Sequence, residues 1–162
     1  MIAGIVPALR ELVGSAIELR LDLAPALPRV QVDPSQLEQI LMDLASNGRD
    51  AMPDGGRLTV TTGELRLAEG DIRARYPGAG MAPGGYVSLA VSDSGTGMSP
   101  DVLEHVFEPF FTTRTLGKGV GLGLAVVYGA VKQNSGYIWA SSEAGRGSRF
   151  EILLAASDAG DG

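Results

Sequence analysis

Residues 93–124 have the sequence DSGTGMSPDVLEHVFEPFFTTRTLGKGVGLGL, which carries the strongest signal in the chain. Glycines occupy positions 95, 97, 117, 119, 121 and 123, and an aromatic and proline cluster at 107–111 separates the two glycine groups. Glycine allows positive φ and lets the backbone approach a phosphate closely. A helix that begins at the last glycines would also present free main-chain amides to an anion. The stretch therefore predicts a nucleotide-binding site.

Length, composition and charge exclude several classes of protein. The 162 residues, 44% hydrophobic and 20% charged, fit one globular domain over residues 1–156 with a disordered tail at 157–162. A net charge of −6 argues against nucleic-acid binding, and the absence of cysteine excludes disulfide and thiolate chemistry. No apolar run approaches the ~18 residues that cross a bilayer, and no signal peptide is present. We therefore expect a cytoplasmic protein without direct membrane contact.

The first third of the chain predicts a helix, a strand and a second helix. A short helix is expected over 7–16, and the alternation over 17–23 is typical of a half-buried strand. The next helix runs to Met52, with Asp33 as N-cap, Pro34 in its first turn and Gln36 at the capping-box position. Its core face follows helical spacing and comprises Leu37, Ile40, Leu41, Leu44 and Ala45.

A second stripe on this helix is polar. Asp43, Asn47 and Asp50 follow one another at helical spacing along a face next to the core face. The stripe is either a solvated face or a functional one. Three polar residues in line on an otherwise apolar helix require an explanation.

The middle of the chain predicts two strands that flank a poorly patterned region. A tight turn at 53–56 leads into a strand over 57–62, and residues 65–76 are interpreted as a variable insertion, partly helical at best. A strand over 86–92 points its odd-numbered residues toward the core, and Asp93 has the same parity. Its carboxylate should therefore point to the covered side of the sheet, where it requires a hydrogen-bonding partner.

The last third predicts a short helix over 99–106, a mobile loop over 112–120, and a buried apolar helix over 121–134 closed by Gly136. A β-hairpin pairs residues 137–142 with 148–155. The predicted fold is an α/β two-layer sandwich, with a mixed sheet of about five strands and about three helices on one face.

Two familiar phosphate-binding loops do not fit. A Walker A loop needs Ser or Thr after its lysine, but Lys118 is followed by Gly119. A dinucleotide-binding fingerprint that starts at Gly117 needs glycine at its sixth position, which here is Leu122.

Four segments in order resemble the N, G1, F and G2 boxes of bacterial sensor histidine kinases. They read QLEQILMDLASNGRDAM, DSGTGM, FEPFFTT and GKGVGLGL, and the likeness covers about residues 15–155. The sequence is thereby similar to the HATPase_c domains of the Bergerat-fold (GHKL) superfamily, which also contains gyrase, MutL and a heat-shock chaperone. The aromatic box and the GRGSRF ending are most similar to hybrid-type kinases.

The resemblance implies a role for each box in binding ATP and Mg²⁺. Asn47 would hold the metal, Asp93 would accept from the adenine amino group, and Gly95 and Gly97 would let the backbone turn beneath the base. Residues 112–118 would form the ATP lid. The candidate cofactor-binding residues are Asn47, Asp50, Asp93, Gly95, Gly97, Met98, Phe107, Thr113, Arg114, Lys118, Gly119, Val120, Gly121, Leu122, Gly123, Leu124 and Ser148.

Within this set, several residues have open alternatives. Arg114 or Lys118 would reach phosphate, while Ser148 would hold the base side through water. Phe107 is interpreted as an anchor for the lid or as part of a docking patch rather than as a stacking partner. A structural role is favoured for Asp50.

The sequence departs from the family pattern at three positions. Asp43 replaces a usual Asn, so it is a metal ligand with Asn47, a partner of such a ligand, or a weak base for water; the last is the least favoured because Asp is shorter than Glu. Asp43 and Asn47 are the candidate catalytic residues. Gly48 replaces a common Ala, and Val120 replaces a frequent Thr.

The resemblance implies donation of the γ-phosphoryl group of ATP to a histidine of a separate dimerisation and phosphoacceptor domain, and onward transfer to a response-regulator receiver. The only histidine, His105, lies outside an acceptor motif and is interpreted as structural. The chain is thus expected to be the catalytic domain of a longer kinase. The alternatives are a hydrolysing ATPase that uses Asp43, and a nucleotide-sensing module without turnover.

Overall fold

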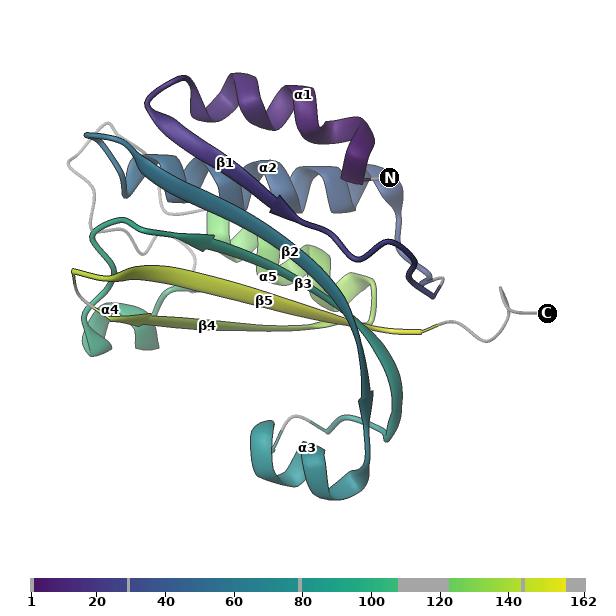
Figure 1. Cartoon of the computed structure of the whole chain (residues 1–162). Coiled ribbons are helices and arrows are strands. Elements are labelled where there is room, and N and C mark those ends of the chain that lie inside the picture. Colours follow the sequence, from purple (N-terminus) through teal and green to yellow (C-terminus); the bar gives the residue numbers. More distant parts are fainter. Residues whose placement is uncertain (1, 29, 79, 108–122, 144, 157–162) are drawn as a thin grey trace.

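A computed structural model describes residues 2–28, 30–78, 80–107, 123–143 and 145–156. Its centre is a five-stranded sheet in the order β1-β2-β3-β5-β4 (Figure 1). The strands are β1 (Ile17–Asp22), β2 (Gly56–Leu67), β3 (Gly84–Asp93), β4 (Tyr137–Glu143) and β5 (Gly147–Ala155). The β1–β2 pair is parallel and the other three pairs are antiparallel, so the sheet is mixed as predicted.

Three helices form the second layer on one face of this sheet (Figure 1). They are α1 (Ile2–Val13), α2 (Pro34–Asp50) and α5 (Gly123–Gln133). Two shorter helices in the described part of the chain, α3 (Glu69–Arg75) and α4 (Pro100–Glu104), lie outside this layer. The predicted α/β two-layer sandwich is confirmed.

The hydrophobic core lies between the sheet and the helical layer. All five predicted core residues of α2 are buried, and Leu41 and Leu44 are each 1% exposed. They meet Leu58 of β2, Leu89 of β3 and Phe150 of β5 in one cluster. The apolar stripe of α2 therefore holds this helix against the three central strands.

The first helix differs from its prediction at both ends. It begins at Ile2, so that Pro7 lies inside it, and it ends at Val13 rather than at residue 16. Gly14 stops the helix because it adopts a left-handed φ of 79°. Ile5 and Leu9 are buried one turn apart, which explains why the helix extends before the proline.

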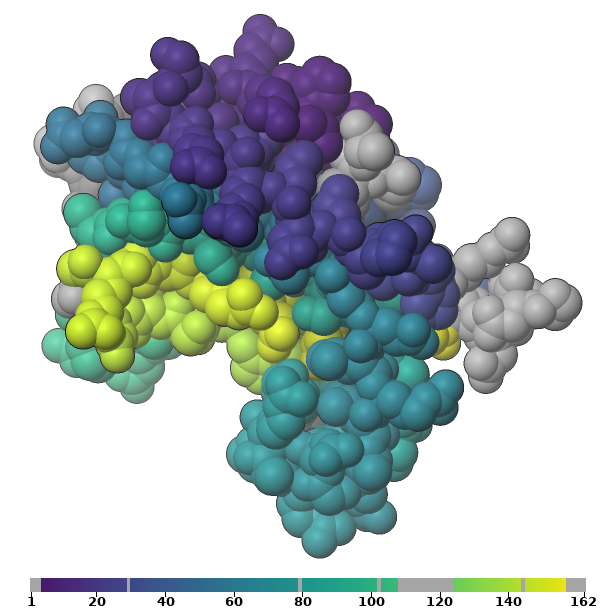
Figure 2. Space-filling model, viewed as in Figure 1, coloured from purple at the N-terminus to yellow at the C-terminus, as the bar shows by residue number. Residues whose placement is uncertain are grey.

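Residues 65–76 are partly helical, as predicted, but they are more regular than the sequence pattern indicated. Strand β2 continues to Leu67, and α3 follows directly. The segment projects from the opposite face of the sheet, where Figures 1 and 2 show α3 as a separate lobe. It is held by a second hydrophobic cluster, which consists of Leu67, Ile72, Tyr76, Met81, Tyr86 and Leu153.

The predicted capping box of α2 is replaced by a tertiary contact. Asp33 caps the helix as expected, since its side chain accepts from the Ser35 amide. The Asp33 amide, however, donates to the side chain of Asn134 (3.0 Å), and Gln36 pairs with Gln133 and Asn134 instead. The start of α2 is therefore held by the end of α5.

The last helix also differs in two respects. Ser135, with φ of 59°, takes the left-handed position that was expected for Gly136. Gly136 instead allows close packing, because a Cβ at this residue would lie 2.8 Å from a methyl group of Leu154. The helix is not fully buried, since Val126 is 51% and Tyr128 41% exposed.

Two predictions fall outside the described residues, namely the loop over 112–120 and the disordered tail over 157–162. None of the described helices has the length and apolar character that a membrane span requires.

Candidate functional site

Asp93 is the last residue of β3, and it pairs with Leu58 of β2 on one side and Ser148 of β5 on the other. Its Oδ1 accepts from the Gly95 amide at 2.9 Å, and the Ser148 amide also donates to the carboxylate. A Cβ at Gly48 of α2 would lie 3.4 Å from the Asp93 Cβ. The carboxylate thus points toward the helical layer and has hydrogen-bonding partners, as its parity predicted.

Burial changes the acid strength of Asp93. Removal from water raises the pKa of this carboxyl, while the amides of Gly95 and Ser148 act in the opposite direction. The group is half-buried, and its remaining lone pairs can accept from a ligand amine.

The glycine turn after Asp93 is fastened to the end of α2. The Thr96 amide donates to the Ala51 carbonyl (3.1 Å), and a Cβ at Gly95 would overlap that same oxygen. Gly97 adopts a left-handed φ of 70°. Both glycines are therefore required by the backbone, Gly95 by contact and Gly97 by conformation.

The β4–β5 hairpin holds the other side of this turn. The Gly145 amide donates to the Thr96 carbonyl (2.6 Å), and the Met98 amide donates to the Ser142 hydroxyl (2.7 Å). Gly147, with φ of 102°, leaves no room for a Cβ beside the Asp93 carbonyl. Sequence reasoning missed Ser142 and Gly147. Ser142 pairs with Ser148 in the β4–β5 hairpin, and the predicted strand ends at these two residues could have indicated Ser142.

The polar stripe lies along α2 as predicted, and its three members differ in environment. Asp43 and Asn47 are half-buried, whereas Asp50 is exposed. Asp43 accepts from the Gln39 side chain at 2.8 Å. Burial raises the pKa of Asp43, and the hydrogen bond from Gln39 opposes this shift. Gln39 is a third residue that the sequence analysis did not indicate.

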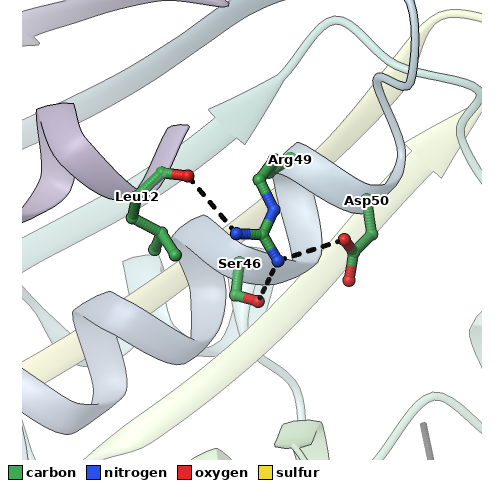
Figure 3. Close-up of polar contacts among 4 residues, drawn as sticks. All are labelled: Leu12, Ser46, Arg49 and Asp50. Carbon is green, nitrogen blue, oxygen red and sulfur yellow. Dashed lines mark hydrogen bonds and ion pairs between the residues drawn. The ribbon is translucent and has the colours of Figure 1, made fainter. Parts of the chain in front are cut away.

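Arg49 joins the stripe to the first helix (Figure 3). Its guanidinium donates to the Leu12 carbonyl at 3.3 Å and approaches the Ser46 hydroxyl and the Asp50 carboxylate at 3.4 Å. This exposed ion pair contributes little stability by itself. Through Arg49, Asp50 lies beside the contact between α1 and α2, and its role stays a prediction.

The stripe can contribute hard oxygen ligands to a metal. Asp43 and Asn47 are one helical turn apart, and magnesium takes one or two such protein oxygens together with phosphate oxygens and water. No group of three or more His, Cys, Asp or Glu side chains that could hold a metal occurs within the described ranges. Asp43 and Asn47 could contribute two oxygens to a metal that also binds the phosphates of a ligand.

The remaining candidates divide between described and undescribed residues. Met98, Phe107 and Leu124 are partly buried against the main core, and the Phe107 ring lies 5.4 Å from that of Tyr128 and 6.2 Å from that of Phe150. Gly123 begins α5. The residues outside the described ranges are Thr113, Arg114, Lys118, Gly119, Val120, Gly121 and Leu122.

A half-buried strand-end carboxylate, a glycine turn and a polar helix stripe on a mixed sheet define a nucleotide-binding α/β domain. The family model for histidine kinase-, DNA gyrase B- and HSP90-like ATPases matches residues 32–158, and the chain belongs to this family.

The chain is similar to parts of several curated sensor kinases. It is 46% identical over 146 residues to sensor kinase CckA of Brucella abortus, which covers 90% of the chain and 15% of that protein. It is 38% identical over 138 residues to sensor histidine kinase ZraS of Escherichia coli K12, which covers 85% of the chain and 25% of that protein. The chain thus spans a quarter or less of the length of these two relatives.

Solved structures share the fold. The mycobacterial sensor histidine kinase MprB superposes with a TM-score of 0.71 at 24% identity, covering 94% of both chains. Full-length ShkA in complex with AMPPNP superposes with a TM-score of 0.70 at 26% identity, covering 97% of this chain and 31% of that one.

Proposed function

We propose that this chain binds Mg-ATP and donates the γ-phosphoryl group to a histidine of a separate dimerisation and phosphoacceptor domain. A response-regulator receiver then takes the phosphoryl group from that histidine. The observation that carries the proposal is the position of Asp93, fastened at the strand end against Gly48 of α2 in a chain of this ATPase family. The likeness to sensor kinases supports the choice of a phosphoacceptor histidine.

The chain's own residues have separate tasks in this proposal. Asp93 accepts a hydrogen bond from the adenine amino group, and the turn held by Ala51 keeps the backbone close beneath the base. Asn47, with Asp43 one turn before it, presents side-chain oxygens toward the phosphates. A magnesium ion, when bound, neutralises charge on the phosphates. Residues 112–118 are proposed to cover them, and the kinase is proposed to work in the cytoplasm.

Phosphoryl transfer requires mainly positioning and electrostatic stabilisation from the protein. One helix positions the base, the glycine turn and the metal-facing stripe. Helix α2 contributes Asp43, Asn47 and Gly48, and the Ala51 carbonyl at its end accepts from the turn. In this proposal α2 sets the distance between the base and the phosphates, and another domain supplies the acceptor histidine.

The test is transfer in trans. The purified chain is incubated with γ-labelled ATP and a dimerisation domain that carries an acceptor histidine, and acid-labile label should appear on that domain. Replacement of the acceptor histidine and Asn47→Ala in this chain should each abolish the label. Normal ATP binding without label on any acceptor domain would favour a nucleotide-sensing module.

One observation favours a second candidate, an ATP-hydrolysing enzyme. Burial raises the pKa of Asp43, which makes it a stronger base than an ordinary Asp, and Gln39 orients it. Steady ATP hydrolysis by the isolated chain that disappears in Asp43→Asn would support this alternative. Transfer to the acceptor domain that persists in Asp43→Asn would support the kinase.

A further inference from the structure

The hydroxyl group of Ser142 is fully used within the protein. Its oxygen accepts from the Met98 amide at 2.7 Å, and it lies 2.8 Å from the Gly147 carbonyl oxygen. A carbonyl can only accept, so the single proton of Ser142 is donated to Gly147. The direction of one neighbouring contact then follows.

That contact joins the hydroxyl groups of Ser142 and Ser148, whose oxygens are 3.0 Å apart. Either oxygen could be the donor by distance alone. Because the Ser142 proton is already donated to Gly147, the proton of this contact must come from Ser148. The Ser142 hydroxyl thus donates one hydrogen bond and accepts two. The Ser148 hydroxyl uses its only proton in the hydrogen bond to Ser142.

The consequence lies at the candidate site. Ser148 is 7% exposed, stands directly opposite Asp93 in the β3–β5 pair, and has the same inward parity. With its proton directed at Ser142, its hydroxyl can act only as an acceptor toward a ligand. The Asp93 carboxylate is also an acceptor, so two acceptors from neighbouring strands face the same region.

We propose that Ser142 is a positioning residue that fixes the Ser148 hydroxyl as an acceptor, so that the site selects a 6-amino purine over a 6-oxo purine. The inference rests on the proposed function, since it assumes that the base lies beside Asp93. An amino group donates directly to such acceptors, whereas a 6-oxo group meets them with its own lone pairs.

The experiment measures the dissociation constants of ATP and ITP for the whole chain by calorimetry. In Ser142→Ala the Ser148 hydroxyl can rotate and donate, so the preference for ATP over ITP should fall roughly three- to tenfold, the effect of one hydrogen bond. Most of this change should be tighter binding of ITP, whose 6-oxo group gains a donor, while the affinity for ATP should change by less than about twofold. Ser142→Thr keeps the hydroxyl and should retain the preference.

Two further variants separate this role from a structural one. Ser148→Ala should lower the preference to a similar extent, and the double variant Ser142→Ala with Ser148→Ala should lower it no further, because both act through one hydroxyl. Ser141→Ala changes the preceding, exposed residue, which points to the opposite face of the sheet, and should have no effect. Should Ser142→Ala not fold, Ser142→Cys nearly keeps the volume, hydrogen-bonds weakly, and should show the same loss.

The outcomes are distinct. Equal weakening of ATP and ITP in Ser142→Ala, or an unchanged preference, would overturn the role of Ser142 and leave the proposed function standing. An original chain that binds ATP no better than ITP would instead overturn the adenine assignment of Asp93, on which the proposed function depends.

Discussion

The main-chain amide of Asp33 donates to the side-chain oxygen of Asn134, a residue 101 positions later in the sequence. The same Asn134 side chain donates to the Gln36 oxygen at 2.7 Å and to the Ala130 carbonyl at 2.8 Å. One amide group therefore joins the first turn of α2 to the last turn of α5, and it satisfies a backbone donor that α2 cannot satisfy itself.

Asn134→Ala should lower the free energy of unfolding by about 1–2 kcal/mol, because it removes a cap and leaves the Asp33 amide without its partner. Urea unfolding followed by circular dichroism measures this change. Gln133→Ala is the matched control, since it removes only one exposed contact with Gln36, and it should cost less. Equal losses in both variants would contradict the capping role of Asn134.

Local patterns predicted the parts of the fold that local forces determine. The apolar stripe of α2, the alternation of β3 and the hairpin of β4 and β5 were all placed correctly. Gly136 was expected to close the last helix from residue type alone. In the structure Ser135 takes the left-handed position, and Gly136 packs closely against Leu154. The partner of the Asp33 amide depends on how α2 and α5 pack, and no local pattern contains that information.

In the candidate site, too, local properties were predicted and contacts between distant segments were not. Asp93 was predicted to point inward from strand parity, which is a local property, and the structure agrees. The contact between Ser142 and Met98 depends on how the hairpin meets the glycine turn, 44 positions away. Likewise, the sequence marked Gly48 only as a departure from a common Ala. The structure shows that its missing side chain brings α2 close to Asp93.

Asp93→Asn should weaken ATP binding about ten- to hundredfold, since a charge-assisted hydrogen bond to the adenine amino group is lost. Inorganic triphosphate carries no base, so its affinity should change by less than about twofold by the same reasoning. Competition against a fluorescent nucleotide measures both ligands on each variant. Equal losses for ATP and triphosphate would contradict the adenine assignment.

The raised pKa of Asp93 makes stability depend on pH with a defined sign. Between the ordinary value of 3.8 and its raised pKa, the folded chain binds the proton more tightly than the unfolded chain does. The stability of the nucleotide-free chain should therefore fall as pH increases through this window and then level off.

Asp43 also has a raised pKa, so it makes the free energy of unfolding fall with pH in the same direction. The contribution of Asp93 is therefore measured as a difference between two chains. Urea unfolding at a series of pH values is compared between the original chain and Asp93→Asn, in which Asp43 still contributes. Parallel curves for the two chains would mean that burial does not perturb Asp93.

Asn47→Ala should remove most of the magnesium dependence of ATP affinity, because it removes a side-chain oxygen proposed to face the metal. The affinity for ATP is measured with magnesium and with EDTA. Ser46→Ala, a neighbouring change outside the metal-facing stripe, should leave the ratio of the two affinities unaltered. An unchanged ratio in Asn47→Ala would exclude Asn47 from the metal site.

Gly95→Ala should destabilise the chain by about 1–3 kcal/mol, since the new Cβ would overlap the Ala51 carbonyl oxygen and displace the turn. Gly129→Ala is the control within α5, where a Cβ would meet nothing within 4 Å. It should stabilise the helix by up to about 1 kcal/mol. Thermal unfolding with and without ATP measures both; a Gly95→Ala chain of unaltered stability would contradict the close contact with Ala51.

The partners of α2 have a consequence for the order in which this protein acquires its site during synthesis. This helix has the clearest capping signals of the predicted helices, yet its first turn is held by Asn134. One of the two strands that flank Asp93 is β5, at residues 147–155. Residues 43–50 leave the ribosome long before these partners exist. Because non-local contacts form last, the helix can form early, but the nucleotide site is completed only when the final strand has emerged.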